Sequence, residues 1–220
     1  NHLDEIANKY PDADALIVCH QNIRWTYSEF RAEIDKLATG LLQLGVEKGD
    51  RVGIWGPNSY EWCLAQYAAA KIGAILVNIN PAYRIVELEY ALNKVGCRAL
   101  ITAEKYKTSD YLAMLNELAP ELADARPAAL NLKALPDLDL IIRMGEQKSP
   151  GMLNFADVCE LGGEEEYQQL SAFKQTLLPD DPINIQFTSG TTGKPKGALL
   201  SHCGILNIAA HIGDAMHFTE

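Results

Sequence analysis

Positive charge is scarce in this sequence. Lysine and arginine number 19 against 29 aspartates and glutamates, which gives a formal net charge of −10 over 220 residues. No cluster or stripe of basic residues stands out, so nucleic acid is not expected as a partner, because a phosphate backbone is bound through such a positive surface. An anionic small molecule would need a locally positive site in this acidic chain.

Cysteines are few and far apart. The sequence has five of them, Cys19, Cys63, Cys97, Cys159 and Cys203. Their odd number and wide separation fit neither a disulfide framework nor the spacing of metal ligands. We therefore expect separate thiols in a reducing compartment and no metal site.

Long apolar runs are also missing. The longest apolar stretch, 63–79, is interrupted by Gln66, Lys71 and Asn78, so it predicts a helix followed by a strand and no membrane span. No secretory signal is recognisable at the start. These features predict a soluble intracellular protein, located in the cytoplasm or, in a eukaryote, in the mitochondrial matrix.

The sequence does contain a close alternation of strand and helix patterns. Buried strands are expected at 51–55, 74–79 and 98–102, and helices at 58–73 and 87–95 lie between them. This order is typical of βαβ units. It predicts an α/β fold with a mostly parallel sheet that is covered by helices on both faces, in αβα layers.

Local signals place the first elements. A short opening helix should end before Pro11, and strands at 15–19 and 23–26 should form a hairpin. Thr26 and Glu29 form a capping box at the start of a helix that Gly45 should end.

Two further caps are predicted later in the chain. Asn58, with Glu61 three residues on, should cap the helix after the 51–55 strand. Near the end, a strand at 198–200 should lead to Ser201, which is expected to cap the last helix.

The alternation fails in the middle of the chain. Prolines punctuate 120–163, and there we expect a strand at 138–144 alone, followed by a solvated acidic run at 164–166. The interpretation is a first α/β portion at 1–119, an irregular excursion at 120–163 and a final portion at 164–220.

The final portion carries a loop with polyphosphate chemistry. Alternating apolar and polar residues at 183–187 predict a strand that enters it. The candidate binding residues are Thr188, Ser189, Gly190, Thr191, Thr192, Gly193, Lys194, Pro195 and Lys196. Glycines let main-chain N–H groups approach phosphate oxygens, hydroxyls add donors, and lysines add charge. No Asp or Glu occurs between Asp181 and Asp214.

The loop differs from the common nucleotide motifs. Pro195 stands where a Walker A loop requires Gly before its Lys, and no G-x-G-x-x-G occurs. A flexible Gly/Thr connector is the alternative interpretation. His202 and His211 follow the loop but have no nucleophile or base at a suitable spacing, so we interpret them as ordinary helix-start or surface residues.

The segment 188–196 resembles the phosphate-binding signature of the adenylate-forming superfamily, which comprises acyl-CoA synthetases, adenylation domains of peptide synthetases and luciferases. The segments 25–27, 49–52, 80–83 and 181–187 resemble acyl-CoA synthetases. Two more, Trp55-Gly56-Pro57-Asn58 and Lys94-Val95-Gly96-Cys97, are similar to medium-chain fatty acid ligases and their bacterial relatives.

The resemblance implies part of the large N-terminal AMP-binding domain of an ATP-dependent fatty acid–CoA ligase that uses ATP, Mg²⁺ and coenzyme A. Lys196 would supply charge to the phosphates, and Lys194 is the weaker candidate. The family's adenine, acyl-pocket and catalytic-lysine motifs do not occur in 1–220. We therefore identify no catalytic residue and expect no C-terminal domain and no activity from this piece alone. The alternatives are a domain that loads an amino or aryl acid onto a carrier protein, and a noncatalytic nucleotide-binding module.

Overall fold

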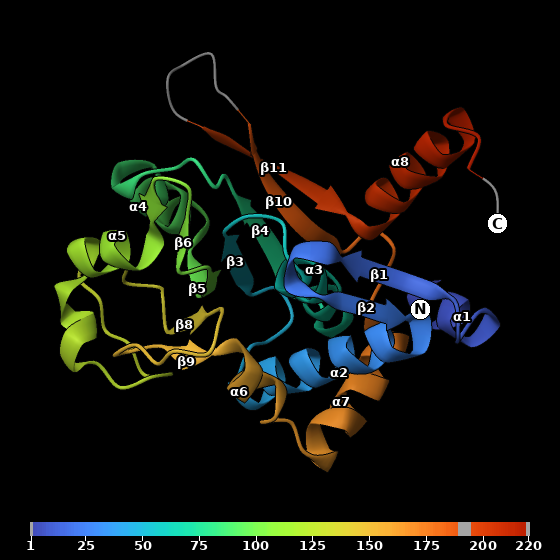
Figure 1. Cartoon of the computed structure of the whole chain (residues 1–220), viewed down its shortest axis with the longest axis horizontal. Coiled ribbons are helices and arrows are strands. Elements are labelled where there is room, and N and C mark those ends of the chain that lie inside the picture. Colours follow the sequence, from blue (N-terminus) through green and yellow to red (C-terminus); the bar gives the residue numbers. More distant parts are fainter. Residues whose placement is uncertain (1, 189–194, 219–220) are drawn as a thin grey trace.

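A seven-stranded sheet forms the centre of the molecule (Figure 1). The computed structural model describes residues 2–188 and 195–218. In spatial order the strands are β11 (Lys196–Ser201), β10 (Pro182–Thr188), β4 (Ile75–Ile79), β3 (Arg51–Trp55), β5 (Cys97–Thr102), β8 (Leu140–Arg143) and β9 (Leu153–Asn154). All neighbouring pairs are parallel except β10 and β11, which are antiparallel. The predicted mostly parallel α/β fold is confirmed.

Helices cover both faces of the sheet (Figure 1). One side carries α2 (Tyr27–Gln43), α3 (Tyr60–Ile72), α6 (Phe155–Cys159) and α7 (Glu164–Thr176). The other carries α4 (Ile85–Val95) and α5 (Tyr111–Leu118). The helices α3 and α4 lie on opposite faces because the chain crosses from β3 to β4 in one direction and from β4 to β5 in the other. Right-handed crossovers in opposite directions place their helices on opposite faces of the sheet.

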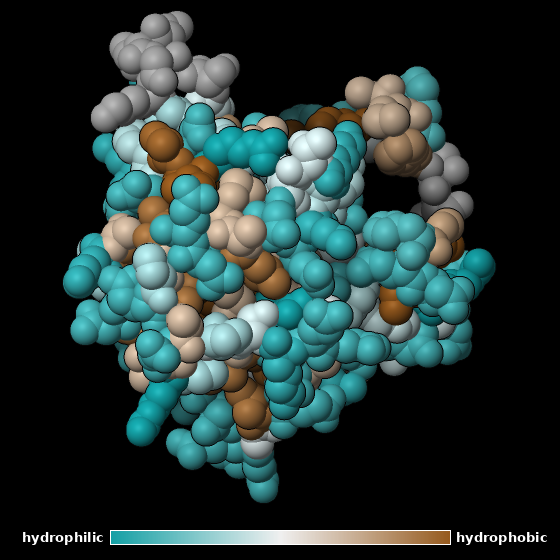
Figure 2. Space-filling view, turned by 60° about the vertical axis from the view of Figure 1, so that its left-hand side comes forward, coloured by the Kyte–Doolittle hydropathy of each residue, from teal (hydrophilic) through white to brown (hydrophobic). Residues whose placement is uncertain are grey.

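Smaller elements lie around this core. They are α1 (His2–Lys9), β1 (Asp14–Val18), the 3₁₀ turn Cys19–Gln21, β2 (Ile23–Thr26), β6 (Lys105–Tyr106), β7 (Ser109–Asp110), the 3₁₀ turn Pro120–Asp124 and α8 (His202–Ala215). The predicted hairpin is confirmed, since β1 and β2 pair antiparallel. Hydrophilic residues predominate on the face shown in Figure 2, where apolar residues form small separate patches.

Two predicted caps are confirmed and one is wrong. Thr26 Oγ1 accepts from the Glu29 amide, and Glu29 accepts from the Thr26 amide, which completes the capping box of α2. Ser201 accepts from the Gly204 amide at the start of α8.

The wrong cap is Asn58, because Ser59 caps α3 by accepting from the Trp62 amide at 3.3 Å. Ser59 has extended backbone and stands three residues before that free amide, which is the geometry that a cap requires. Glu61 is 4% exposed and accepts from Gln21 Nε2 at 2.9 Å.

The middle of the chain holds more structure than its prolines suggest. The strand expected at 138–144 is β8, and the structure adds α5, β9, α6 and α7, which the sequence did not predict. The acidic run is the first turn of α7, and the interpretation as solvated is wrong for Glu166. Its carboxylate accepts from the Gly163 amide at 2.8 Å, because the free N–H groups of a helix start attract an anion.

Candidate functional site

The candidate site lies at the carboxyl edge of the parallel strands. β10 runs parallel to β4 and ends at Thr188, so the segment after it begins where β4 also ends. Ligands of open α/β sheets bind outside this edge. The predicted loop is therefore placed where an α/β protein binds a ligand.

The root of the loop is the end of the β10–β11 hairpin. Thr188 pairs with Lys196, and the Thr188 hydroxyl lies 3.4 Å from the Lys196 carbonyl oxygen, to which it donates. β11 begins at Lys196, two residues earlier than the strand predicted at 198. Both Thr188 and Lys196 are exposed, so their side chains are accessible to a ligand.

The structure places three of the nine predicted binding residues: Thr188, Pro195 and Lys196. The other six, Ser189, Gly190, Thr191, Thr192, Gly193 and Lys194, lie outside the described residues. The antiparallel hairpin brings Thr188 and Lys196 together across the two strands.

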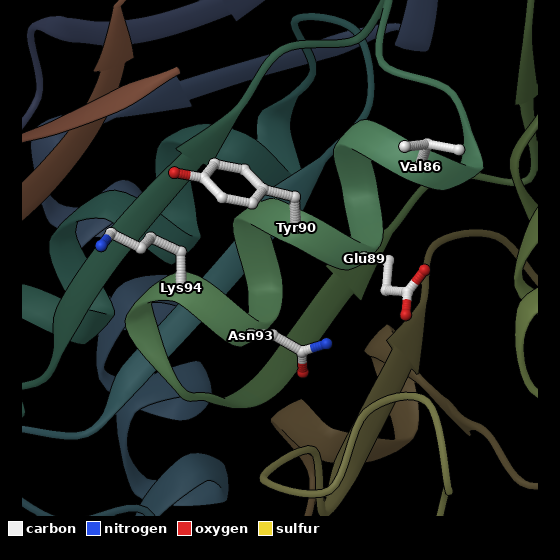
Figure 3. Close-up of a pocket in the computed structure, with 5 residues that line it drawn as sticks. All are labelled: Val86, Glu89, Tyr90, Asn93 and Lys94. Carbon is white, nitrogen blue, oxygen red and sulfur yellow. The ribbon is translucent and has the colours of Figure 1, made fainter. Parts of the chain in front are cut away.

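A residue that the sequence did not single out also reaches this root. The Tyr90 hydroxyl on α4 donates to the Pro195 carbonyl oxygen at 3.2 Å. In Figure 3, Tyr90 and Lys94 point to one side of α4, whereas Glu89 and Asn93 point to the other. Helical periodicity places Tyr90 on a different side of α4 from the buried Leu88, and no sequence signal connects it with a residue 105 positions later.

Polar side chains also join β10 to its neighbours below the loop. Asn184 is fully buried on β10 and lies 3.4 Å from both Asn78 on β4 and Gln66 on α3, with hydrogen bonds to each. Buried amides need partners, so this chain of three fixes β10 against the sheet and α3. No pattern in the sequence predicted these contacts.

The two histidines lie away from the loop root. Lys196 is the first residue of β11, whereas His202 comes directly after its last residue. The His202 amide donates to the Asp181 carbonyl oxygen at 3.2 Å. Burial lowers the pKa of His202, against the opposing effect of the Asp181 charge. His211 is exposed on α8. These positions support the interpretation of both as ordinary residues.

The five thiols are free, and three are hard to ionise. Burial raises the pKa of Cys63, and it raises those of Cys97 and Cys159 to about 12. Within 2–188 and 195–218, no group of three or more His, Cys, Asp or Glu side chains could hold a metal ion. No helix in those ranges is both long enough and apolar enough to cross a membrane.

Sheet order and parallel pairing thus define an α/β protein, and the candidate ligand site follows β10. The AMP-binding enzyme family matches residues 3–219. The chain belongs to the AMP-binding enzyme family.

Curated relatives agree with this membership. The chain is 49% identical to the mitochondrial medium-chain acyl-CoA ligase ACSF2 of Bos taurus, over 99% of this chain and 35% of that protein. It is 46% identical to ACSF2 of Homo sapiens over the same shares. The chain therefore spans about a third of the length of these relatives.

Solved structures share the fold. The acetoacetyl-CoA synthetase from Streptomyces lividans superposes with a TM-score of 0.76 and 27% identity, over 96% of this chain and 31% of that one. The anthranilate CoA ligase AuaEII, solved with anthranoyl-AMP, gives a TM-score of 0.71 and 25% identity over 91% and 34%. The fold is that of adenylate-forming enzymes.

Proposed function

We propose that the whole protein is an AMP-forming ligase that joins a fatty acid to coenzyme A. The observation that carries this proposal is the 49% identity to a medium-chain acyl-CoA ligase over 99% of the chain. The loop root at the carboxyl edge of the sheet supports it, because this is a position for binding ATP.

The reaction has two steps. A carboxylate oxygen attacks the α-phosphorus of ATP, the bond to the β-phosphate oxygen breaks, and acyl-adenylate and pyrophosphate form. The thiol of coenzyme A then attacks the acyl carbon, loses its proton and releases AMP. The first step is needed because a free carboxylate has no good leaving group, and AMP provides one.

The proposed part of this chain is to bind the β- and γ-phosphates. The hydroxyls of Thr188, Ser189, Thr191 and Thr192 and the loop N–H groups would position them, and Lys196 would neutralise charge on the departing pyrophosphate. Magnesium, when bound, would share this neutralisation and is held largely by phosphate oxygens. The described residues contain no cluster for a metal, so we assign none of them to it.

The proposal extends to domain and location. We propose that 1–119, 120–163 and 164–220 are successive portions of one N-terminal AMP-binding domain. The ACSF2 relatives are mitochondrial by name. For this chain, a cytoplasmic or mitochondrial-matrix location stays a prediction.

A screen of acids in the ATP–pyrophosphate exchange reaction tests the function. The full-length protein is expected to exchange label with octanoate in preference to acetate, palmitate or benzoate. A maximum with acetate or benzoate would refute the medium-chain substrate and leave the reaction type standing. A maximum with amino acids would favour the carrier-loading alternative. If none of the acids supports exchange, a noncatalytic nucleotide-binding module would be favoured.

A further inference from the structure

The loop root stands on a projecting part of the hairpin. β10 is paired with β4 over Asn184–Gln186, and the pairing with β11 continues to Thr188 and Lys196. The end of the hairpin therefore extends past the paired segment of β4, which leaves its orientation to contacts from outside the sheet.

Tyr90 supplies one such contact from a helix that is itself firmly held. Leu88, Ala91 and Leu92 of α4 are 0–2% exposed, so this helix is packed against the core along one face. Tyr90, drawn in Figure 3, is half-buried on a different side of α4, and its hydroxyl donates to the Pro195 carbonyl oxygen at 3.2 Å. The hydrogen bond thus ties the hairpin end to the core.

The bonded carbonyl belongs to the peptide unit that joins Pro195 to Lys196. This unit is planar, so holding its oxygen fixes the direction in which the chain enters Lys196. The proline ring fixes the preceding φ angle, and Thr188 binds the next carbonyl, that of Lys196. Two consecutive carbonyls at the loop root are therefore held by side chains, one from α4 and one from β10.

We propose that Tyr90 is a positioning residue for ATP binding: its hydroxyl orients the Pro195–Lys196 peptide so that the Lys196 ammonium meets the polyphosphate. This inference rests on the proposed function, in which Lys196 contacts ATP. Tyr90 itself acts through Lys196 and does not touch the reacting atoms.

The surroundings of Tyr90 allow its hydroxyl to be tested apart from its ring. The ring lines a shallow hollow of about 450 Å³ with Val86, Glu89, Asn93 and Lys94. Val86 is 74% exposed, so the hollow opens to solvent along α4. Tyr90→Phe keeps the ring in this place and removes the hydroxyl, and with it the hydrogen bond to Pro195.

The experiment measures adenylation in the full-length protein with Tyr90→Phe. We expect kcat/KM for ATP to fall by about two- to tenfold, the usual effect of one neutral hydrogen bond, while KM for octanoate and the melting temperature hold. In a Lys196→Ala background the same substitution should have no further effect, since Tyr90 acts through that lysine. Tyr167→Phe, an exposed tyrosine on α7, is the matched control and should leave all values unchanged.

Amide exchange at Lys196 and Gly197 gives a readout that needs no substrate. Exchange should be faster in Tyr90→Phe and unchanged in Tyr167→Phe. The inference would be overturned if Tyr90→Phe had the same amide exchange rates and the same kcat/KM for ATP as the wild type. It would also be overturned if KM rose equally for ATP and octanoate and the melting temperature fell. If no acid supports ATP–pyrophosphate exchange by the wild-type protein, the proposed function fails. The amide-exchange measurement still decides whether Tyr90 holds the loop root.

Discussion

At the scale of single residues, Lys196 should have the largest effect on chemistry. It is exposed at the start of β11, at the root of the loop proposed to bind ATP, and a charge-assisted contact contributes about 1.5–3 kcal/mol. Lys196→Ala in the full-length protein should therefore lower octanoate-dependent ATP–pyrophosphate exchange by about one to two orders of magnitude.

Lys133→Ala is the matched control for charge. Lys133 is an exposed lysine between α5 and β8, and its loss should leave exchange unchanged. Exchange by Lys196→Ala within a factor of about two of the wild type would remove Lys196 from the ATP site.

Gly40 gives a prediction about stability. On helix propensity alone, Gly40→Ala in α2 would stabilise the protein by about 1 kcal/mol. A Cβ on Gly40 would lie 1.9 Å from the Val158 carbonyl oxygen of α6, a backbone atom that cannot turn away. We therefore expect Gly40→Ala to lower the free energy of unfolding by at least about 2 kcal/mol, measured by denaturant titration.

The opposite substitution on the same helix calibrates this result. Ala32 is exposed on α2, so Ala32→Gly removes propensity alone and should cost about 1 kcal/mol. If Gly40→Ala were as stable as the wild type, the close approach of α2 and α6 would be wrong.

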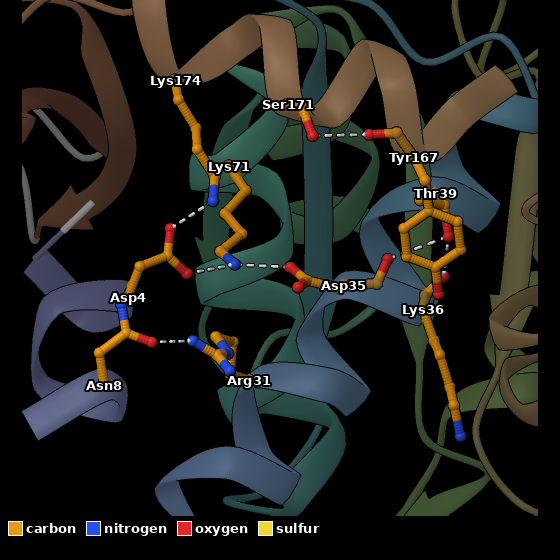
Figure 4. A network of polar contacts seen from close by, with 10 residues as sticks. All are labelled: Asp4, Asn8, Arg31, Asp35, Lys36, Thr39, Lys71, Tyr167, Ser171 and Lys174. Atoms are coloured by element: carbon orange, nitrogen blue, oxygen red, sulfur yellow. Dashed lines mark hydrogen bonds and ion pairs between the residues drawn. The ribbon is translucent and has the colours of Figure 1, made fainter. Parts of the chain in front are cut away.

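At the scale of elements, one ionic network joins four helices. Lys71 of α3 contacts both Asp4 of α1 and Asp35 of α2, and Lys174 of α7 lies 3.1 Å from Asp4 (Figure 4). Burial raises the pKa of Asp4, but the hydrogen bonds from Lys71 and Lys174 outweigh it and lower this pKa to about 2. The ionised carboxylate therefore stabilises the packing of α1.

The network predicts a pH dependence with a definite sign. The pKa of Asp4 is lower in the folded than in the unfolded protein, so its contribution is full above about pH 4 and is lost as the pH falls toward about 2. Asp4→Asn should lower the free energy of unfolding by about 1–2 kcal/mol at neutral pH, after allowance for solvent screening.

Unfolding titrations of both proteins across this range check the prediction, since the difference between them should shrink with falling pH. Glu5→Gln is the control, because Glu5 is the next residue of α1 and its side chain is 77% exposed. A difference between Asp4→Asn and the wild type that stays constant down to about pH 2 would contradict the assigned pKa.

Some of the helices and strands could be predicted from the sequence, and others could not. The central strands and α2, α3 and α4 follow from their apolar patterns, and α2 also from its capping box, whereas the cap predicted for α3 was wrong. α7 was missed because its buried residues are Glu166 and Leu170, which make too weak an apolar stripe. α6 is five residues long, and β9 is two, so neither shows a period.

The sequence offers a candidate site, but it does not predict the contacts that hold the site in place. Hydroxyls, glycines and lysines within nine residues predict a phosphate loop, because local composition carries phosphate chemistry, and this assignment stays a prediction. Tyr90 and Asn184 act through partners 105 and 118 positions away, and only the folded chain brings such pairs together.

At the scale of the whole molecule, the last part of the chain lacks cover among the described residues. Helix α8 has no buried residue within 202–215. The exposed apolar side chains of this region are 49–70% exposed and comprise Leu199, Leu206, Ile208, Ile212, Met216 and Phe218. Such a surface is typical of a face that packs against other protein.

This exposure and the missing family motifs predict that residues 1–220 alone are catalytically silent. A phosphate loop without an adenine site and an acyl pocket cannot hold ATP and acid in line, so most of the proximity effect is lost. Purified residues 1–220 with ATP, magnesium, octanoate and coenzyme A should release no pyrophosphate and should tend to aggregate. Sustained turnover, free of contaminating ligase, would show that this piece is a complete enzyme.

The most direct test of the proposed ligase function is the product balance of the full-length protein. With ATP, magnesium, octanoate and coenzyme A, we predict AMP, pyrophosphate and octanoyl-CoA in equal amounts, and none of the three without octanoate. ADP and phosphate in place of AMP and pyrophosphate, or nucleotide turnover that does not depend on the acid, would contradict an AMP-forming acid–thiol ligase.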